Sequence, residues 1–536
     1  MPSALDPFAS TRYDLLVIGG GIHGLFAAYD AAQRGLTVAL VDRADFGSGL
    51  TFNHQRTIHG GLRSLSSGQI GKTRRQIDER RNWARIAPHM LRPLPFLIGT
   101  YGWTTRSRWA VRAGFRVYDL VGRKRNRHVS PELHLPRARL ESAAATRRLF
   151  PGVAEPGLSG GAIWYDYQTR HPDRLAWTVA LAARQAGAVL ANWIQAETPL
   201  RAGGRVVGAR VRDVITDRQR DIEARVTIVA AGADAAALAP AFGIARTPPL
   251  LRAMNLLINR PARDIATAAP ARSGRMLTAV PWRGFVLVGT HQSDSTVEPG
   301  ESAPPAGAVE AFLDDVNTTF PRLKAAAQDV RLVHHGLTPA VVRNGKADLL
   351  PEPEVTRQTG DGAGVISLVG VKFTTARSAA ERAVDAACTE LAGRFRRSRT
   401  AATPLPHADI ADVEGRLIET LRELDLALDR DVMEHLTSWY GTEASAVVRY
   451  GAQGNLLDRL SPETPVLTAE MAYAVDHAQA RALSDAVLRR TPLGSAGHPG
   501  RAAIERAAGI VSEKLGWTED QRKSEIEAVE GIYPKH

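Results

Sequence analysis

The sequence predicts an α/β + α architecture: an α/β domain with a parallel sheet, an inserted antiparallel-sheet domain and an all-helical C-terminal domain. Three observations lead to this prediction. Residues 14–42 read as strand, glycine-rich turn, helix and strand. Residues 250–342 contain apolar or alternating runs such as MNLLIN, MLTAV and FVLVGTH, which are typical of strands. From about residue 410 the pattern is helical only, with turn signals such as YGTE and GHPG.

The first strand–turn–helix–strand unit predicts a dinucleotide site. DLLVIG is a short apolar run that ends in glycines, as in a buried strand, and TVALVD is a second such run. Gly19, Gly21 and Gly24 form G-x-G-x-x-G, and Asp42 ends the second strand. Glycines permit a tight turn against a pyrophosphate, the helix N-terminus supplies N–H donors, and an acidic residue binds a ribose diol. A glycine turn in an unrelated α/β unit is the disfavoured alternative.

Two further glycine turns favour FAD over NAD as the cofactor. VTIVAAGA, residues 226–233, is a strand that ends in a turn at Gly232. ISLVGVKFTTARSAAERAVD, residues 366–385, passes Gly370 and continues as a long helix. Since a flavin ring lies far from the adenosine end of FAD, it needs contacts remote from the first motif. A helix N-terminus at the third turn would stabilise the negative charge of a reduced flavin.

Several motifs resemble one family over nearly the whole chain. They are DLLVIGGGIHGLFAAYDAAQRGLTVALVD, TIHGGLRSL, VGVKFTTAR and, near the C-terminus, LTSWYGTEASAVV, RRTPLG and LGWTEDQRKSEIE. Together they resemble the FAD-dependent, aerobic-type glycerol-3-phosphate dehydrogenases of the D-amino-acid-oxidase-like flavoprotein group. The glycine motif is shared by many flavoproteins, whereas IHGGLR and the C-terminal motifs are much more specific.

The resemblance implies a domain organisation. A Rossmann-type FAD-binding domain is expected from residues 11–90, 150–245 and 355–390. An inserted antiparallel-sheet substrate or cap domain is expected from residues 91–149 and 246–354. Residues 405–536 are expected to form the C-terminal helical domain.

The resemblance also implies an activity. An FAD-dependent dehydrogenase of this type would oxidise glycerol 3-phosphate, or a related anionic polyol derivative, to the ketone by hydride transfer to flavin N5. Two alternatives stay open at this point: an amine or amino-acid oxidase of the same flavoprotein group, and a flavoprotein that has lost turnover.

The run RTIHGGLRSL is expected, by the resemblance, to pass beside the flavin ring. Gly60 and Gly61 would let the backbone approach FAD where a Cβ would clash. Arg63 would point into the substrate pocket and bind an anionic oxygen, with a surface salt bridge as its alternative role. His59 would fix the loop by hydrogen bonds, and a covalent bond from His59 to FAD is a minor alternative.

Further pocket residues follow from the resemblance, as do departures from it. Lys372 and Thr374 match the family's G-G-K-x-T-T run close to the flavin, and Lys372 is also expected near the substrate. Arg357 in EVTR matches a phosphate-binding arginine. Thr338 stands where the family has an arginine, and Asn255 where it has a histidine that is a candidate base. Neither replacement can do the original chemistry, so the departures predict a changed substrate.

Three histidines are candidates for a replacement base. His291 stands in GTHQSD, where the family has a threonine, and His334 and His335 lie in LVHHGL. A purely structural role is at least as well supported for any one of them.

The net charge of +12 favours an anionic partner, although an arginine-rich composition explains it equally well. The segment 101–127 mixes aromatic and basic side chains: Tyr101, Trp103, Trp109, Phe115, Tyr118, Arg106, Arg108, Arg112, Arg116, Arg123, Lys124, Arg125 and Arg127. This mixture suits an anionic membrane surface, and the family feeds electrons to membrane quinone. An amphipathic helix packed on the core is the alternative.

Nucleic acid is an unlikely partner, because no recognised motif for it is present. A homodimer and a quinone or oxygen acceptor are compatible with the sequence.

Composition also predicts a location. Cys388 is the only cysteine, so neither an internal disulfide nor a thiolate metal site is expected, and no metal is predicted. The N-terminal residues lack the basic and apolar regions of a secretory signal, and no apolar run reaches the length of a spanning helix. We expect a cytoplasmic protein, or one that is peripheral on the inner face of the cell membrane.

Overall fold

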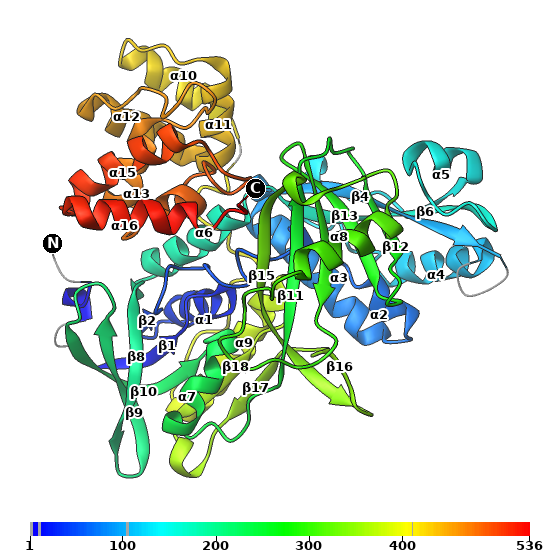
Figure 1. The fold of residues 1–536 in the computed structure, drawn as a ribbon. Helices are drawn as coiled ribbons and strands as arrows, with labels where there is room; N and C mark the ends of the chain where they lie inside the picture. The colour runs from blue at the N-terminus through cyan, green and yellow to red at the C-terminus, as the bar shows by residue number, and fades with distance from the viewer. Residues whose placement is uncertain (1–3, 9–11, 103–106, 410, 536) are drawn as a thin grey trace.

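The structure is a computed structural model and describes residues 4–8, 12–102, 107–409 and 411–535. Within these residues the chain forms two sheets and a C-terminal group of helices (Figure 1). No described helix combines the length and the apolar character that a bilayer span requires.

The first sheet forms the α/β domain. Its described strands follow the order β17-β18-β10-β1-β2-β7, and β8 and β9 extend β10 as a meander. The bounds are β1 (Tyr13–Ile18), β2 (Val38–Val41), β7 (Val189–Ala191), β8 (Ile194–Ala202), β9 (Arg205–Asp213), β10 (Gln219–Val229), β17 (Glu354–Arg357) and β18 (Val365–Val369). β1 pairs in parallel with β2 and β10, and β10 in parallel with β18, so the three glycine turns meet at one edge of the sheet.

Helices cover this sheet on one face. They are α1 (Ile22–Gln33), α6 (Pro172–Gln185) and α9 (Ala376–Leu391), and their apolar sides share one core with β1, β2 and β18. The other face packs on β8, β9 and α7 (Ala235–Phe242). This is the predicted Rossmann-type arrangement, in which strands buried on both faces are almost continuously apolar.

The second sheet is mostly antiparallel, with the order β16-β15-β11-β14-β13-β12-β4-β6-β3 and with β5 beside β6. The bounds are β3 (Thr57–Ile58), β4 (Leu91–Tyr101), β5 (Arg139–Ser142), β6 (Leu158–Thr169), β11 (Leu250–Ile258), β12 (Ala266–Pro270), β13 (Met276–Trp282), β14 (Phe285–Gln292), β15 (Val330–Arg343) and β16 (Lys346–Leu349). α8 (Ala308–Thr319) packs on one face.

One predicted boundary needs correction. β6 lies inside the segment 150–245, which we expected in the FAD-binding domain, but it belongs to the second sheet. The cause is its long antiparallel ladder with β4, which runs from the Leu91–Thr169 pair to the Tyr101–Leu158 pair. The chain therefore returns to the first sheet only after residue 169.

The remaining helices lie beside these sheets. Four connect the strands of the N-terminal part: α2 (Leu62–Ser66), α3 (Ile70–Ile86), α4 (Arg108–Val121) and α5 (Ala143–Leu149). The C-terminal group comprises α10 (Val413–Glu423), α11 (Arg430–Tyr440), α12 (Ala444–Gly454), α13 (Thr468–Asp476), α14 (Leu483–Asp485), the π-helical segment η9 (Ala486–Arg490), α15 (Arg501–Leu515) and α16 (Glu519–Glu530). This group packs on the second sheet through Leu257, Trp282 and Leu332 and lies beside α6 (Figure 1).

Candidate active site

The first glycine turn has the backbone that a dinucleotide site requires. Gly19 has a φ of +111°, and a Cβ there would overlap the Ala230 carbonyl. A Cβ on Gly24 would overlap the Gly19 carbonyl, so the first turn of α1 lies directly against the loop. Gly21, the N-cap of α1, has room for a Cβ, whose nearest neighbour would be Thr51. Two of the three motif glycines are thus required by the chain's own packing.

Asp42 faces this turn. Its Oδ2 accepts a hydrogen bond from the Gly20 N–H at 2.5 Å, and its Oδ1 accepts one from the Ala44 N–H at 2.8 Å. Burial raises the pKa of Asp42 to about 6 in spite of these donors. A partly desolvated carboxylate beside the turn suits hydrogen bonding to a ribose diol.

His23 lies between the first and third glycine turns. Its imidazole occupies the place that a Cβ of Gly370 would take, and its buried Nε2 has no hydrogen-bond partner among the described residues. A buried orphan nitrogen beside a phosphate-binding turn fits a bound dinucleotide. Gly232, in the second glycine turn, has a φ of +60° and begins the segment that follows β10. These residues together fit FAD.

Gly60 and Gly61 are required by the packing of the protein itself. A Cβ on Gly60 would overlap the Tyr118 hydroxyl and the Arg80 guanidinium, and a Cβ on Gly61 would overlap the Gln76 amide. Protein side chains therefore already exclude a larger residue at both positions.

The IHGG loop is tied to the start of α9. The His59 N–H donates to Thr374 Oγ1 at 3.0 Å, and the Gly60 N–H donates to Asp166 Oδ1 at 2.7 Å. Asp166 also forms a buried ion pair with Arg80. Burial acts to raise the pKa of Asp166, but Arg80 and His59 outweigh it and the pKa is lowered. The loop and the third glycine turn are thus one connected unit.

The His59 imidazole projects from this unit and is 51% exposed. Its Nδ1 lies 3.4 Å from Asp166 Oδ2, and its Nε2 lies 2.9 Å from Thr57 Oγ1. A carboxylate beside Nδ1 favours the tautomer with the proton on that nitrogen, which leaves Nε2 as an acceptor.

Three cations converge beside this loop. Lys372 follows β18, Arg63 lies on α2, and Lys72 lies on α3 with only 11% of its side chain exposed. Lys72 Nζ donates to the Pro351 carbonyl at 2.8 Å and lies 3.7 Å from a Glu352 oxygen. The pKa of Lys372 falls to about 8, first because of desolvation and then because Lys72 and Arg63 are positive, although the Glu352 carboxylate acts to raise it. Such a cluster is suited to binding an anion.

Sequence reasoning missed Lys72. Its signal is one lysine in the basic run GKTRRQIDERR, which reads as a solvated helix. Its partners Pro351 and Glu352 lie about 280 residues further along the chain, so no local pattern could place it near Lys372.

Arg357 does not join this cluster, contrary to expectation. It pairs with Ile366 at the beginning of β18, whereas Gly370 and Lys372 follow the other end of that strand. Its guanidinium forms an ion pair with Glu390 on α9. The register of β17 on β18 therefore points Arg357 at a helix and away from the turn.

Asn255 lies on the face of the second sheet that is turned away from α8. Its Nδ2 donates to the Asn53 carbonyl at 3.2 Å, and its Oδ1 accepts from Thr290 Oγ1 at 2.8 Å. Thr338, four residues after His334 on β15, shares this face, because Asn255 and His334 are directly paired.

Both ring nitrogens of His334 are hydrogen-bonded. Arg56 Nη2 donates to its Nε2 at 3.1 Å, so its Nδ1–H donates to Asn53 Oδ1, also at 3.1 Å. Burial and the neighbouring positive charge of Arg56 lower its pKa far below the usual value. The imidazole is locked in its neutral form, with both nitrogens occupied.

His291 and His335 face elsewhere. A register shift between Met254 and Leu256 pairs His291 with Met254, and the His291 ring packs 5.0 Å from the Phe312 ring of α8. His335 alternates with His334 and bonds the Ser302 carbonyl at 2.9 Å. Neither ring lies on the Asn255 face of the sheet, because both residues pair with Met254.

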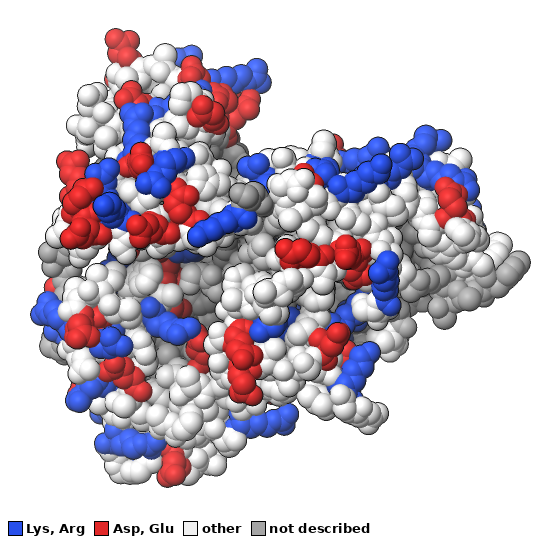
Figure 2. Space-filling view, viewed as in Figure 1, with Lys and Arg blue, Asp and Glu red and all other residues white. Residues whose placement is uncertain are grey.

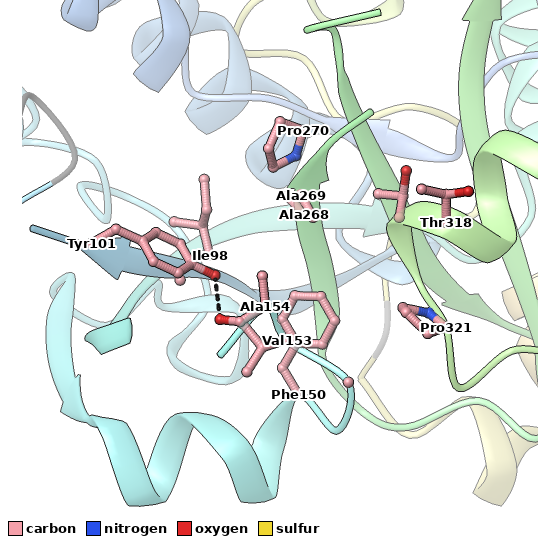
Figure 3. Close-up of a pocket in the computed structure, with 13 residues that line it drawn as sticks. Ile98, Tyr101, Phe150, Val153, Ala154, Ala268, Ala269, Pro270, Thr318 and Pro321 are labelled. Atoms are coloured by element: carbon pink, nitrogen blue, oxygen red, sulfur yellow. Dashed lines mark hydrogen bonds between the residues drawn. The ribbon is translucent and has the colours of Figure 1, made fainter. Parts of the chain in front are cut away.

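A cavity of about 350 Å³ lies apart from these residues, on the α8 side of the second sheet (Figure 3). Its lining is apolar or carries hydroxyls, from Ile98, Tyr101, Phe150, Ala268, Pro270 and Thr318 among others. The Tyr101 hydroxyl donates to the Ala154 carbonyl at 3.1 Å across it. Because its lining carries no charged side chain, the cavity is not an anion site.

The segment 101–127 divides into a packed and an exposed side. Phe115 and Tyr118 are buried, as expected for the alternative of an amphipathic helix that packs on the core. Trp109, Val117 and Leu120 of α4 are exposed, Trp109 and Leu120 by 67% each. The flanking Arg108, Arg112, Arg116, Arg123, Lys124 and Arg127 are exposed too, whereas Arg125 pairs with Asp119 at 2.9 Å. Trp103 and Arg106, which we expected to contribute to this surface, lie outside the described residues.

Charge is spread unevenly over the molecule. Figure 2 shows basic side chains along the edge over α5, whereas the C-terminal helices carry both signs.

Comparison with known proteins assigns both parts of the chain. Residues 14–385 match the family described as FAD dependent oxidoreductase, and residues 398–522 match the C-terminal domain of alpha-glycerophosphate oxidase. The chain is 28% identical to a glycerol-3-phosphate dehydrogenase of Synechocystis sp., over 97% of this chain and 96% of that protein. It is 30% identical to one of Mycobacterium leprae, over 98% and 88%. Its fold is similar to that of the glycerol-3-phosphate dehydrogenase from Bacillus halodurans complexed with FAD, with a TM-score of 0.75, 24% identity and coverage of 99% and 96%.

Proposed function

The chain belongs to the FAD-dependent oxidoreductase family, and from this premise we propose that it oxidises glycerol 3-phosphate, or a closely related anionic polyol derivative, to the ketone. FAD is its cofactor. The observation that supports the substrate class most directly is the convergence of Arg63, Lys72 and Lys372 beside the IHGG loop.

Lys72 can replace a missing charge. Where relatives of this type are expected to carry an arginine, this chain has Thr338, and its Arg357 is committed to Glu390. Lys72, largely buried and held by the Pro351 carbonyl, supplies a cation from a different element. The anionic group of the substrate would lie between Lys72, Lys372 and Arg63.

His59 is the proton acceptor in this proposal. Oxidation of a secondary alcohol removes a hydride from carbon and a proton from oxygen. FAD, when bound, supplies the hydride acceptor. His59 is held against the start of α9, Asp166 orients its Nδ1–H, and its Nε2 can take the hydroxyl proton in place of its contact with Thr57.

Anaerobic flavin reduction with a substrate panel tests this function. We expect glycerol 3-phosphate to bleach the flavin and to yield a ketone, and glycerol, which lacks the anion, to do so far more weakly. His59→Gln should slow the bleaching step with little change in substrate affinity. Bleaching by amines or amino acids instead, with an imine product, would contradict the proposal.

We propose further that α4 binds an anionic membrane surface on the inner face of the cell membrane, where a quinone or another acceptor would reoxidise the flavin. The exposed Trp109, Val117 and Leu120 with flanking arginines support this, since an apolar strip with a basic border suits the headgroup region.

A further inference from the structure

A buried ion-pair network joins the C-terminal helices to the α/β domain. Asp45 lies in the turn after β2, and Arg489 and Arg490 belong to η9, within the sequence RRTPLG. Arg490 Nη2 lies 2.6 Å from Asp45 Oδ1, and Arg489 Nε lies 2.6 Å from Asp45 Oδ2. Arg489 also pairs with Asp485 at 2.8 Å. All four side chains are buried.

The two arginines are themselves fixed. Arg490 Nε donates to the Ala478 carbonyl at 2.6 Å, and its guanidinium lies 4.8 Å from the centre of the Trp177 ring on α6. The Trp193 indole N–H donates to Asp485 at 2.9 Å. The side chains that bind Asp45 are therefore themselves fixed by contacts with Ala478, Trp177 and Asp485.

Asp45 belongs to the turn that supports the first glycine turn. Residues 42–47 bond Gly20 on both sides: Asp42 accepts from the Gly20 N–H, and the Gly47 N–H donates to the Gly20 carbonyl at 2.9 Å. Asn192 Nδ2 donates to Asp45 Oδ1 at 2.8 Å from the strand on the other side. A shift of Asp45 would thus move the backbone that shapes the dinucleotide turn.

Stability alone is a weak reason for this arrangement. Burying charges costs desolvation free energy, and a well-packed apolar cluster of similar volume is often as stable. An apolar cluster makes no directional contacts. Here four charge-assisted hydrogen bonds, three from Arg489 and Arg490 and one from Asn192, fix the position of the Asp45 carboxylate.

We propose that Arg489 and Arg490 are positioning residues for FAD: through Asp45, docking of the C-terminal domain fixes the turn that holds Gly20 and thereby sets the affinity for the cofactor. The coupling is reciprocal, so bound FAD also strengthens docking of the C-terminal domain. This proposal rests on FAD as cofactor and is independent of which substrate is oxidised.

Two matched substitutions test it. Asp45→Asn removes the charge that the two arginines bind. Glu443→Gln breaks a largely buried ion pair across the same boundary, with Arg174 on α6, and among the described residues this pair shares no partner with Asp45 or Asp485. Both variants should lower the melting temperature. We expect the Kd of FAD, measured by fluorescence on reconstitution, to rise by about tenfold or more in Asp45→Asn and to change less than about twofold in Glu443→Gln. Equal Kd changes in the two variants would overturn the proposal.

A second measurement needs no variant. Hydrogen exchange of residues 483–491 in the wild-type protein should be faster without FAD than with it, while the interior of α15 and α16 is little affected. Exchange in residues 483–491 that is independent of FAD would also overturn the proposal. Arg490→Lys, which keeps the charge, should recover part of the FAD affinity that Arg490→Met loses.

Discussion

Single residues decide which ligand charges this site accepts. Lys372, Lys72 and Arg63 provide positive charge from three different elements, whereas Thr338 and Asn255 are themselves uncharged. Local sequence predicted Lys372 and the three glycine turns, because each lies in a short run whose geometry is local. It could not predict the roles of Arg357 or His291: a strand register turns Arg357 toward Glu390, and a register shift turns His291 toward α8.

The pKa of Lys372 predicts a pH dependence. Below its pKa of about 8 the amine is protonated and attracts the substrate anion; above it the amine is neutral and the attraction is lost. Because kcat/KM reports groups of the free enzyme, kcat/KM for glycerol 3-phosphate should fall as pH rises through about 8. Lys372→Met should flatten this limb in a steady-state pH profile. An unchanged limb in Lys372→Met would assign the decline to another group.

Asp42 predicts a second pH dependence, in cofactor binding. Its pKa is raised to about 6, so the carboxylate becomes ionised as pH rises through that value, and an ionised acceptor forms the stronger hydrogen bonds to a ribose diol. The Kd of FAD should therefore decrease between pH 5 and pH 7. Asp42→Ala should weaken binding at neutral pH by about 1–3 kcal/mol and remove the dependence. Fluorescence titration of the FAD-free protein measures both.

The two uncharged residues Thr338 and Asn255 predict that cationic replacements gain affinity for the substrate. Thr338→Arg with Asn255→His should tighten glycerol 3-phosphate, since each charge-assisted bond to a phosphate contributes about 1.5–3 kcal/mol. Anaerobic flavin reduction gives the substrate Kd for both proteins. If the wild type already binds as tightly as the double variant, Lys72 fully replaces the missing arginine.

Elements explain which side chains can act together. α3 carries Lys72, which lies near Lys372, and the IHGG loop is bonded to the segment that precedes α9. β6 belongs to the second sheet, although in the chain it lies between β2 and β7 of the first sheet. Sequence periodicity predicted most of these elements but not their partners, because pairing between distant strands depends on the whole sheet. α4 shows the same limit: its mixture of aromatic and basic residues was evident, but packing alone separates buried Phe115 and Tyr118 from exposed Trp109.

The exposed side of α4 predicts electrostatic membrane binding. Arg116, Arg123, Lys124 and Arg127 changed to glutamate should weaken binding to anionic liposomes by about 1 kcal/mol or more per charge. Arg125 is left in place because it pairs with Asp119. The matched control changes four exposed arginines outside α4 to glutamate: Arg394, Arg396, Arg397 and Arg399. Equal liposome co-sedimentation of the two variants at low salt would argue that α4 is only a solvated face.

At the scale of the whole molecule, the candidate site depends on all three parts of the chain. The first sheet supplies the glycine turns, the second sheet supplies the Asn255 face, and the C-terminal helices hold the turn at Asp45. The sequence predicted these three parts and the family. It could not predict the junctions, because Arg490 and Asp45 lie far apart in the chain and meet only after folding.

The most direct test of the central claim compares anaerobic flavin reduction by glycerol 3-phosphate and by glycerol in three proteins. These are the wild type, Lys72→Met, and Arg357→Met as a control that removes a cation outside the cluster. If the cluster holds the substrate anion, Lys72→Met should raise the Kd for glycerol 3-phosphate about tenfold, leave the weak reaction with glycerol unchanged, and differ clearly from Arg357→Met. Equal effects of the two substitutions, or no preference of the wild type for glycerol 3-phosphate over glycerol, would contradict the account.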